Sequence, residues 1–115
     1  MSQPKRKIEL LAPAKDFQTA VDAIDCGADA VYIGGAKFGA RYAAGNSLDD
    51  IRRTAEYAHR YGVRVYATLN TLLFDDELEE AERLAKEIIK TGVDALIVQD
   101  MAYCRMDLPI ELHAS

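Results

Sequence analysis

Three similar phrases recur along the chain, and they restrict its fold more than any other feature. They read Gly-Ala-Asp-Ala-Val-Tyr-Ile from Gly27, Gly-Val-Arg-Val-Tyr-Ala-Thr from Gly62 and Gly-Val-Asp-Ala-Leu-Ile-Val from Gly92. Each glycine follows a stretch with helical periodicity and precedes an apolar run, which is where a helix ends in a left-handed cap. Helix, glycine and buried strand together predict successive βα units, and such units form a parallel sheet with right-handed crossovers.

The repeat places the expected elements. Apolar stripes at helical spacing predict three helices, which begin near Asp16, at Ser47 and at Asp75 or Asp76. The residues at 101–107 are too few for a further full helix. Strands are expected at 8–12, where Pro13 ends the first, and at 30–33, 64–70, 95–99 and 110–114. We therefore expect an α/β fold of about five parallel strands and three to four helices, and a final strand without a covering helix predicts a truncated domain.

Composition limits the class of protein. At 115 residues the chain is at most one domain, with 50% hydrophobic and 29% charged residues, which is ordinary for a globular protein. The net charge of −5 argues against a nucleic-acid-binding face spread over the chain, but it does not exclude a local basic pocket. No apolar run approaches the ~18 residues of a transmembrane helix, and the start has no signal-peptide core, which predicts a cytoplasmic protein.

The two cysteines, Cys26 and Cys104, stand alone and lack Cys-x-x-Cys spacing. We expect two buried thiols in a reducing compartment. No group of cysteines and histidines has the spacing of metal ligands, so we predict no metal site.

The segment from Val31 to Asn46 is the first candidate for a binding site. A connector between strand and helix usually has about 2–6 residues, whereas this one is longer, rich in glycine, and carries Lys37 and Arg41. Loops that leave the carboxyl ends of parallel strands are where ligands bind. We expect Lys37, Arg41 and Asn46 to bind substrate, and Arg41 could clamp a carboxylate or phosphate or neutralise a neighbouring acid.

Polar side chains also gather where the later strands end. Thr68 and Asn70 end the third predicted strand, and Gln99 and Asp100 end the fourth. Exposure to solvent would tolerate this pattern, but Asn is disfavoured in strands, and amide and hydroxyl groups facing inward need partners or a ligand. We expect these four residues to bind substrate.

Two titratable groups are candidates for catalysis. Glu9 lies in the first predicted strand. It could act as a base, anchor a ligand, or form a structural ion pair with Arg41 or Lys37. His113 lies in the last strand, as a general acid–base or as a hydrogen-bonded packing residue. A common carboxyl edge of the sheet predicts that six of the candidates converge: Glu9, Arg41, Thr68, Asn70, Gln99 and His113.

Six segments carry a resemblance to a known family. They are Ile8-Glu-Leu-Leu-Ala-Pro-Ala14, Gly27-Ala-Asp-Ala-Val-Tyr-Ile-Gly-Gly35, Phe38-Gly-Ala-Arg41, Val65-Tyr-Ala-Thr-Leu-Asn70, Val93-Asp-Ala-Leu-Ile-Val-Gln-Asp100 and Leu112-His-Ala-Ser115. Together they resemble the N-terminal part of peptidase family U32, the collagenase-like peptidases. The resemblance implies a barrel several hundred residues long, so that residues 1–115 would be the N-terminal part of a partial TIM-type (β/α) barrel.

The resemblance implies an enzyme, and in the first place a peptidase. Some relatives are instead RNA-hydroxylation or quinone-hydroxylation proteins with an iron–sulfur cluster, so the alternative is part of an iron–sulfur-dependent protein that modifies tRNA or rRNA. Lys15 stands where many relatives have glycine, and the family's cysteine-containing signature is absent from the chain. We expect no cofactor on this chain, a cluster only on the full-length protein, and no peptidase activity of the chain alone.

Sheet edges favour self-association of the chain. The first and fifth predicted strands would both be edges, and an inner face with Leu10, Val31, Val65, Leu69 and Ile97 would lack an opposite wall. We expect a homo-oligomer, as a twofold dimer, and no membrane partner. The substrate of the full-length protein, peptide or RNA, stays open.

Overall fold

Five parallel strands form one sheet in the computed structural model, which describes residues 9–34, 47–69 and 78–114. Crossover helices connect the first four strands, and a short 3-10 helix connects the last two. The strands are β1 (Leu11–Ala14), β2 (Ala30–Gly34), β3 (Arg64–Leu69), β4 (Ala95–Val98) and β5 (Glu111–Ala114). The helices are α1 (Phe17–Asp25), α2 (Leu48–Arg60), α3 (Leu78–Ile89) and the 3-10 helix η3 (Met101–Arg105).

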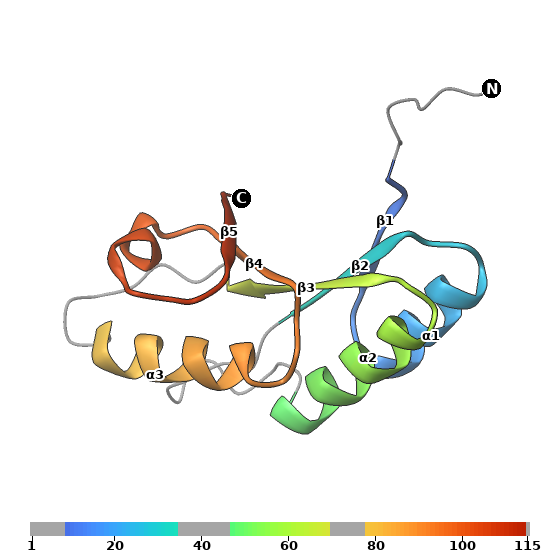
Figure 1. Ribbon diagram of the computed structural model, residues 1–115, viewed down its shortest axis with the longest axis horizontal. Helices are drawn as coiled ribbons and strands as arrows, with labels where there is room; N and C mark the ends of the chain where they lie inside the picture. The colour runs from blue at the N-terminus through green and yellow to red at the C-terminus, as the bar shows by residue number, and fades with distance from the viewer. Residues whose placement is uncertain (1–8, 35–46, 70–77, 115) are drawn as a thin grey trace.

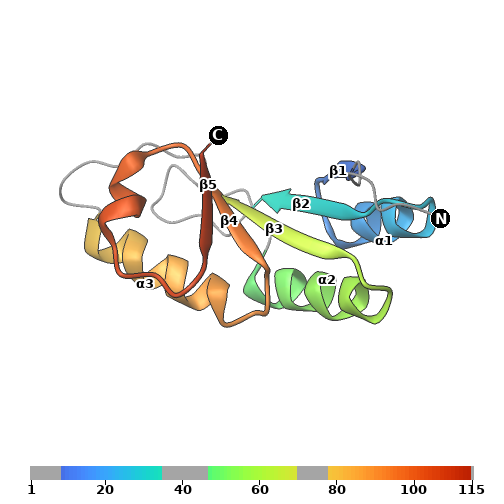
Figure 2. The same ribbon diagram turned by 45° about the horizontal axis from the view of Figure 1, so that its top comes forward.

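The three α-helices all lie on the same side of the sheet (Figure 1), and a view turned by 45° shows the same arrangement (Figure 2). A doubly wound sheet carries helices on both faces, whereas a (β/α) barrel keeps them outside and pairs strands that follow each other in sequence. The observed strand order is β1-β2-β3-β4-β5, with every pair parallel. The chain is therefore an α/β fold and part of a TIM-type barrel, as the sequence predicted.

One apolar layer is buried between the helices and the sheet. Strand side chains alternate between two faces, and Val31 of β2 and Val65 of β3 are fully buried in the same cluster as Ile88 of α3. Full burial of a side chain of this size stabilises a fold by about 1.5–3 kcal/mol. The helix-facing side of the sheet is thus the main core.

The sequence prediction that two valines and one leucine lie on an inner face without an opposite wall is wrong. Val31, Val65 and Leu69 belong to the cluster shared with the helices, and Ile97 packs instead with Ala30 on the opposite side. Alternate residues of a strand point to opposite faces, so an error of one position moves a whole set of side chains to the other face.

The three repeated glycines end the helices as predicted. Gly27, Gly62 and Gly92 have φ angles of 104°, 71° and 104°. The amide after the glycine turns back to the helix, because Ala28 N donates to Ala23 O at 3.0 Å and Val63 N to Ala58 O at 3.0 Å. This is the hydrogen bond of a Schellman cap, and it redirects the chain from α1 and α2 into the strands that follow them.

Side-chain caps begin the first two helices where the sequence predicted. Asp16 Oδ1 accepts hydrogen bonds from Thr19 N at 2.9 Å and Thr19 Oγ1 at 2.7 Å, and Ser47 Oγ accepts from Asp50 N at 3.1 Å. The backbone hydrogen bond from Thr19, followed by the hydroxyl, holds the pKa of Asp16 below its ordinary value. The predicted start of the third helix lies outside the described residues.

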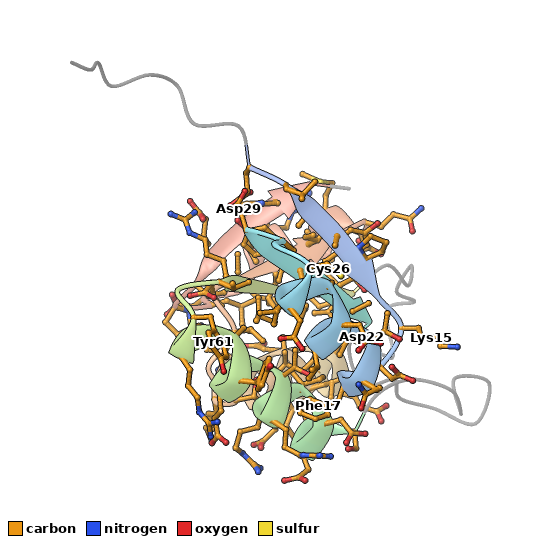
Figure 3. The ribbon with its side chains drawn as sticks, turned by 90° about the vertical axis from the view of Figure 1, so that its right-hand side faces the viewer. Lys15, Phe17, Asp22, Cys26, Asp29 and Tyr61 are labelled. Atoms are coloured by element: carbon orange, nitrogen blue, oxygen red, sulfur yellow. The ribbon has the colours of Figure 1, made fainter. Side chains whose placement is uncertain are left out.

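Two further expectations are wrong. The first strand begins at Leu11 and contains Pro13, which we expected to end it. Within the described sheet β1 is an edge strand, and an edge tolerates proline because its outer side makes no ladder hydrogen bonds. Cys26 and Cys104 are both exposed, not buried, and Figure 3 shows Cys26 at the end of α1.

Gly62 tests the helix cap without a steric clash, because a Cβ there would meet no atom within 4 Å. We expect Gly62→Ala to lower the free energy of unfolding by about 1–2 kcal/mol, the cost of a left-handed L-residue. Gly62→Asn should lose less, since asparagine adopts this conformation more readily. Urea unfolding of both variants measures the difference, and equal losses would contradict a purely conformational role.

Asp16 should make the stability of the chain depend on pH in acid. Its folded pKa lies below the ordinary value of 3.8, so its stabilisation is complete above that value and disappears as pH falls through the folded pKa. Asp16→Asn keeps a good cap without a titrating group. We expect thermal unfolding between about pH 5 and pH 2 to show a weaker pH dependence in Asp16→Asn than in the parent. Superimposable profiles would show that Asp16 does not carry the effect.

Candidate functional site

The face of the sheet away from the helices, here called the open face, carries the candidate site. Ala30, Tyr66 and Ala95 form a second buried cluster there, against which Tyr32 and Ile97 pack. Strand alternation and the register add the residues that share this parity. From β1 to β5 the strand residues of the open face are Leu11, Pro13, Ala30, Tyr32, Gly34, Arg64, Tyr66, Thr68, Ala95, Ile97, Glu111 and His113.

The carboxyl half of the open face brings two of the predicted site residues into one row. Thr68 pairs in register with Ile97, and Ile97 pairs with His113. Thr68 Oγ1 lies 3.5 Å from Ile33 O, a long contact that leaves the hydroxyl weakly held. A hydroxyl and an imidazole thus flank an apolar residue at the edge where ligands of parallel sheets bind.

His113 lies between two neighbours. Its Nε2 atom is 3.2 Å from Glu111 Oε1, and its ring centroid is 5.4 Å from that of Tyr66, with the ring planes tilted by 57°. Its side chain is 40% exposed, so a ligand can reach it. The imidazole is therefore both held and accessible, as an acid–base group in a binding site has to be.

Glu9 lies at the opposite edge of the sheet, which corrects the expected convergence. β1 starts only at Leu11, which pairs with Ala30, and Ala30 pairs with Arg64, so Glu9 precedes the first row of the ladder. Its carboxylate oxygens are each 3.4 Å from the Tyr66 hydroxyl. Parallel strands have their carboxyl ends at one edge. The sequence prediction began β1 a few residues too early, and with the observed start Glu9 lies at the amino edge.

A polar hollow of about 360 Å³ opens beside Glu9 at this amino edge, lined also by Asp29, Gly62 and Arg64. The hydrogen-bonded Tyr66 hydroxyl, followed by the Glu9 carboxylate, raises the pKa of Arg64. Glu9 and Arg64 are therefore two opposite charges that line the same hollow. In TIM-type barrels this edge supports stability, whereas the carboxyl edge carries the chemistry.

The remaining predicted site residues divide into two groups. Gln99 is exposed directly after β4, and its backbone N–H donates to Leu69 O at 3.4 Å, which extends the ladder toward the carboxyl edge. Asp100 Oδ1 accepts a hydrogen bond from Ala102 N at 2.8 Å, so this carboxylate caps η3. Lys37, Arg41, Asn46 and Asn70 lie outside the described residues, and their expected role in binding stays a prediction.

Sequence reasoning missed the function of the aspartates in the repeated phrase. Asp29 Oδ2 accepts a hydrogen bond from Leu10 N at 2.9 Å, and Asp94 Oδ2 accepts one from Val65 N at 2.8 Å. Asp94 also lies 2.9 Å from His59 Nε2. Each aspartate thus fastens the start of its own strand to the strand before it. The repeat itself was the signal, because Asp29 and Asp94 occupy the same place in two of the three phrases.

Asp94 should contribute measurably to stability through these contacts. We expect Asp94→Ala to lower the free energy of unfolding by about 1–3 kcal/mol, since the Val65 N–H loses a charged acceptor. Asp94→Asn keeps an acceptor oxygen and should lose less. His59→Ala separates the contribution of the imidazole, and denaturant unfolding measures all three variants. A loss in Asp94→Ala no larger than that in His59→Ala would contradict the fastening role.

The described residues do not fit a metal centre or an iron–sulfur cluster. Within 9–34, 47–69 and 78–114, no three side chains of His, Cys, Asp or Glu come together to hold a metal ion. Cys26 caps α1 and Cys104 belongs to η3, and both thiols face solvent. No described helix has the length and apolar character needed to cross a membrane.

The sequence matches the family model of Peptidase family U32 over residues 15–115. The match covers most of the chain, so the chain belongs to peptidase family U32.

Named relatives fall into two groups. The chain is 57% identical over 116 residues to the 23S rRNA 5-hydroxycytidine C2501 synthase of Escherichia coli. The alignment covers 100% of this chain and 18% of that protein. It is 35% identical to tRNA hydroxylation protein P1 of Bacillus subtilis, over 96% of this chain and 27% of that protein. It is also 30% identical to a collagenase of Porphyromonas gingivalis, over 93% of this chain and 27% of that protein. The chain therefore spans less than a third of the length of each.

A solved structure supports the fold. The hydroxymethylglutaryl-CoA lyase of Pseudomonas aeruginosa, a TIM-barrel protein, superposes with a TM-score of 0.65 at 17% identity. The superposition covers 84% of this chain and 36% of the lyase. At this identity the likeness supports the partial barrel and carries no information about substrate.

Proposed function

We propose that this chain is part of an RNA-hydroxylating enzyme that forms 5-hydroxycytidine in 23S rRNA, and that its open face binds the target base. The 57% identity to the Escherichia coli synthase over the whole chain carries the proposal. The collagenase shares 30%, so the peptidase reading has the weaker support. The RNA alternative is thus favoured over the peptidase that the family name suggests.

The geometry of the open face suits a base better than a peptide bond. A base that is to be modified has to leave its stack and enter a pocket with hydrogen-bonding groups and an aromatic or apolar wall. Thr68 and His113 offer the polar groups, and Ile97 between them is apolar. A peptidase of the serine or cysteine type needs a nucleophile beside a base, and among the described residues no Ser or Cys contacts His113.

We give His113 the part of an acid–base or hydrogen-bonding group and Thr68 the part of a base-binding hydroxyl. Lys37, Arg41, Asn46, Asn70 and Gln99 are proposed substrate contacts as well. Glu9 contacts the Tyr66 hydroxyl at the amino edge, so we no longer propose it as a base. We assign no redox step to the described residues, and we place any iron–sulfur cluster on the remainder of the longer protein.

We also propose that the chain self-associates, but the structure changes the reason for expecting it. The open face carries Tyr32, Thr68 and His113 as well as apolar groups, so the argument from an apolar inner wall is weaker. The edges of β1 and β5 support it instead, and Leu10 before β1 and Leu11 at its start are 57% and 41% exposed. Unpaired strand edges favour pairing with another chain.

The test uses the full-length protein in an Escherichia coli strain that lacks its own 23S rRNA 5-hydroxycytidine C2501 synthase. We expect the parent sequence to restore 5-hydroxycytidine at C2501, measured by mass spectrometry of rRNA fragments. His113→Ala should lower the modified fraction at least about 100-fold, as expected for loss of a positioned acid–base group. Arg52→Ala, which removes a half-exposed surface ion pair with Asp49, is the control for a variant without effect.

A second measurement separates the two readings of the family. The purified full-length protein is incubated with gelatin and with casein. Unmodified C2501 despite normal protein levels, together with cleavage that His113→Ala abolishes, would overturn the RNA proposal in favour of the peptidase.

A further inference from the structure

We propose that Tyr66 is the positioning residue of this site, which holds the His113 imidazole in the orientation that meets the substrate base. The identity of the substrate in this inference rests on the proposed function. The contact between the two rings is a property of the chain itself. No comparison assigns a role to either residue.

Tyr66 is fixed more firmly than any other polar side chain of the open face. It lies on β3, the central strand, and only 5% of the residue is exposed. Its ring belongs to the buried cluster with Ala30 and Ala95. Its hydroxyl lies 3.4 Å from both oxygens of Glu9, and it raises the pKa of Arg64 on the same strand. The ring is therefore held at its base by the sheet and at its tip by the Glu9 carboxylate.

His113 is held loosely without this ring. Its backbone belongs to β5, an edge of the described sheet, and its side chain is 40% exposed. Its other partner, Glu111, is 70% exposed, and a solvated carboxylate fixes a side chain poorly. The Tyr66 ring, 5.4 Å away at a tilt of 57°, is the buried wall that restricts the imidazole.

Among the described residues, the two ring nitrogens of His113 differ in their surroundings. Nε2 of His113 faces Glu111, and Nδ1 has no hydrogen-bond partner among the residues that the structure describes. A tilted aromatic contact fixes the plane of the imidazole and hence the direction in which Nδ1 points. An error of about 1 Å in the placement of a reacting group can reduce a rate about 100-fold.

The geometry also connects the two edges of the sheet through one side chain. Glu9 at the amino edge contacts the Tyr66 hydroxyl, and the Tyr66 ring contacts His113 toward the carboxyl edge. Glu9 therefore acts on the site through Tyr66. Because the hydroxyl contacts are long, the ring should matter more than the hydroxyl.

The first experiment compares Tyr66→Phe with Tyr66→Leu in the full-length protein, in the strain that lacks the synthase. We expect Tyr66→Phe to retain 5-hydroxycytidine at C2501 within about 3-fold, since the ring remains and only long contacts are lost. Tyr66→Leu should lower it about 100-fold. The affinity of each purified protein for an rRNA fragment containing C2501, and its thermal midpoint, should be equal in the two variants.

Rescue by phenylalanine at unchanged RNA affinity distinguishes positioning from support of the fold. Equal modification by Tyr66→Leu and the parent would overturn the inference. Equal loss in Tyr66→Phe and Tyr66→Leu would also overturn it, since the hydroxyl and not the ring would then be responsible. A fall in modification that parallels a fall in thermal midpoint would assign Tyr66 a structural role alone.

The second experiment does not depend on the proposed function. Full-length protein labelled only at histidine gives the ring resonances of His113, assigned by their absence in His113→Gln. We expect these resonances to move in Tyr66→Leu and to stay near their parent positions in Tyr66→Phe. Tyr61→Leu is the control, because Tyr61 lies at the end of α2, is 61% exposed, and should leave them unchanged.

The two experiments fail separately. If the parent protein leaves C2501 unmodified, the proposed function is wrong, and the histidine spectra still test the contact. If His113 resonances are the same in Tyr66→Leu and the parent, the positioning role is wrong even where C2501 is modified.

Discussion

Burial of one sheet face by helices is the constraint on which the rest of the structure depends. Each crossover from β1 to β4 returns over the same side, so Ile51 of α2 and Ile88 of α3 share one core with Val65 of β3. Alternate strand side chains, among them Val31, Val65 and Leu96, are buried in this layer. The other strand side chains have no helix over them among the described residues, and Thr68 and His113 lie on this open face.

The amino and carboxyl edges of the sheet serve different purposes. At the amino edge Asp29 and Asp94 fasten adjacent strands, and the left-handed glycines turn each helix into its strand. Toward the carboxyl edge, Thr68 and His113 share a row. Tyr66 contacts groups at both edges, which is why an acid placed on the wrong edge by sequence reasoning still bears on the candidate site.

Membership of peptidase family U32 determines the scaffold more firmly than the reaction. A collagenase and two RNA-hydroxylating relatives all align with the chain over at least 93% of its length. The scaffold that they share supplies an open sheet face, and the groups placed on that face decide the chemistry. The chain is 57% identical to the rRNA synthase and 30% identical to the collagenase, and this difference is the ground on which the proposal favours RNA.

The sequence by itself determined the order and type of the elements, because a glycine cap after an amphipathic helix is a local requirement of the backbone. Gly27, Gly62 and Gly92 could therefore be placed from the sequence, as could the caps Asp16 and Ser47. Tertiary structure decided which strand residues face the helices and where β1 begins. Register is set by pairing between distant segments, and a shift of one residue exchanges the two faces of a strand. Only that pairing brings Tyr66 against His113 and leaves Glu9 at the opposite edge.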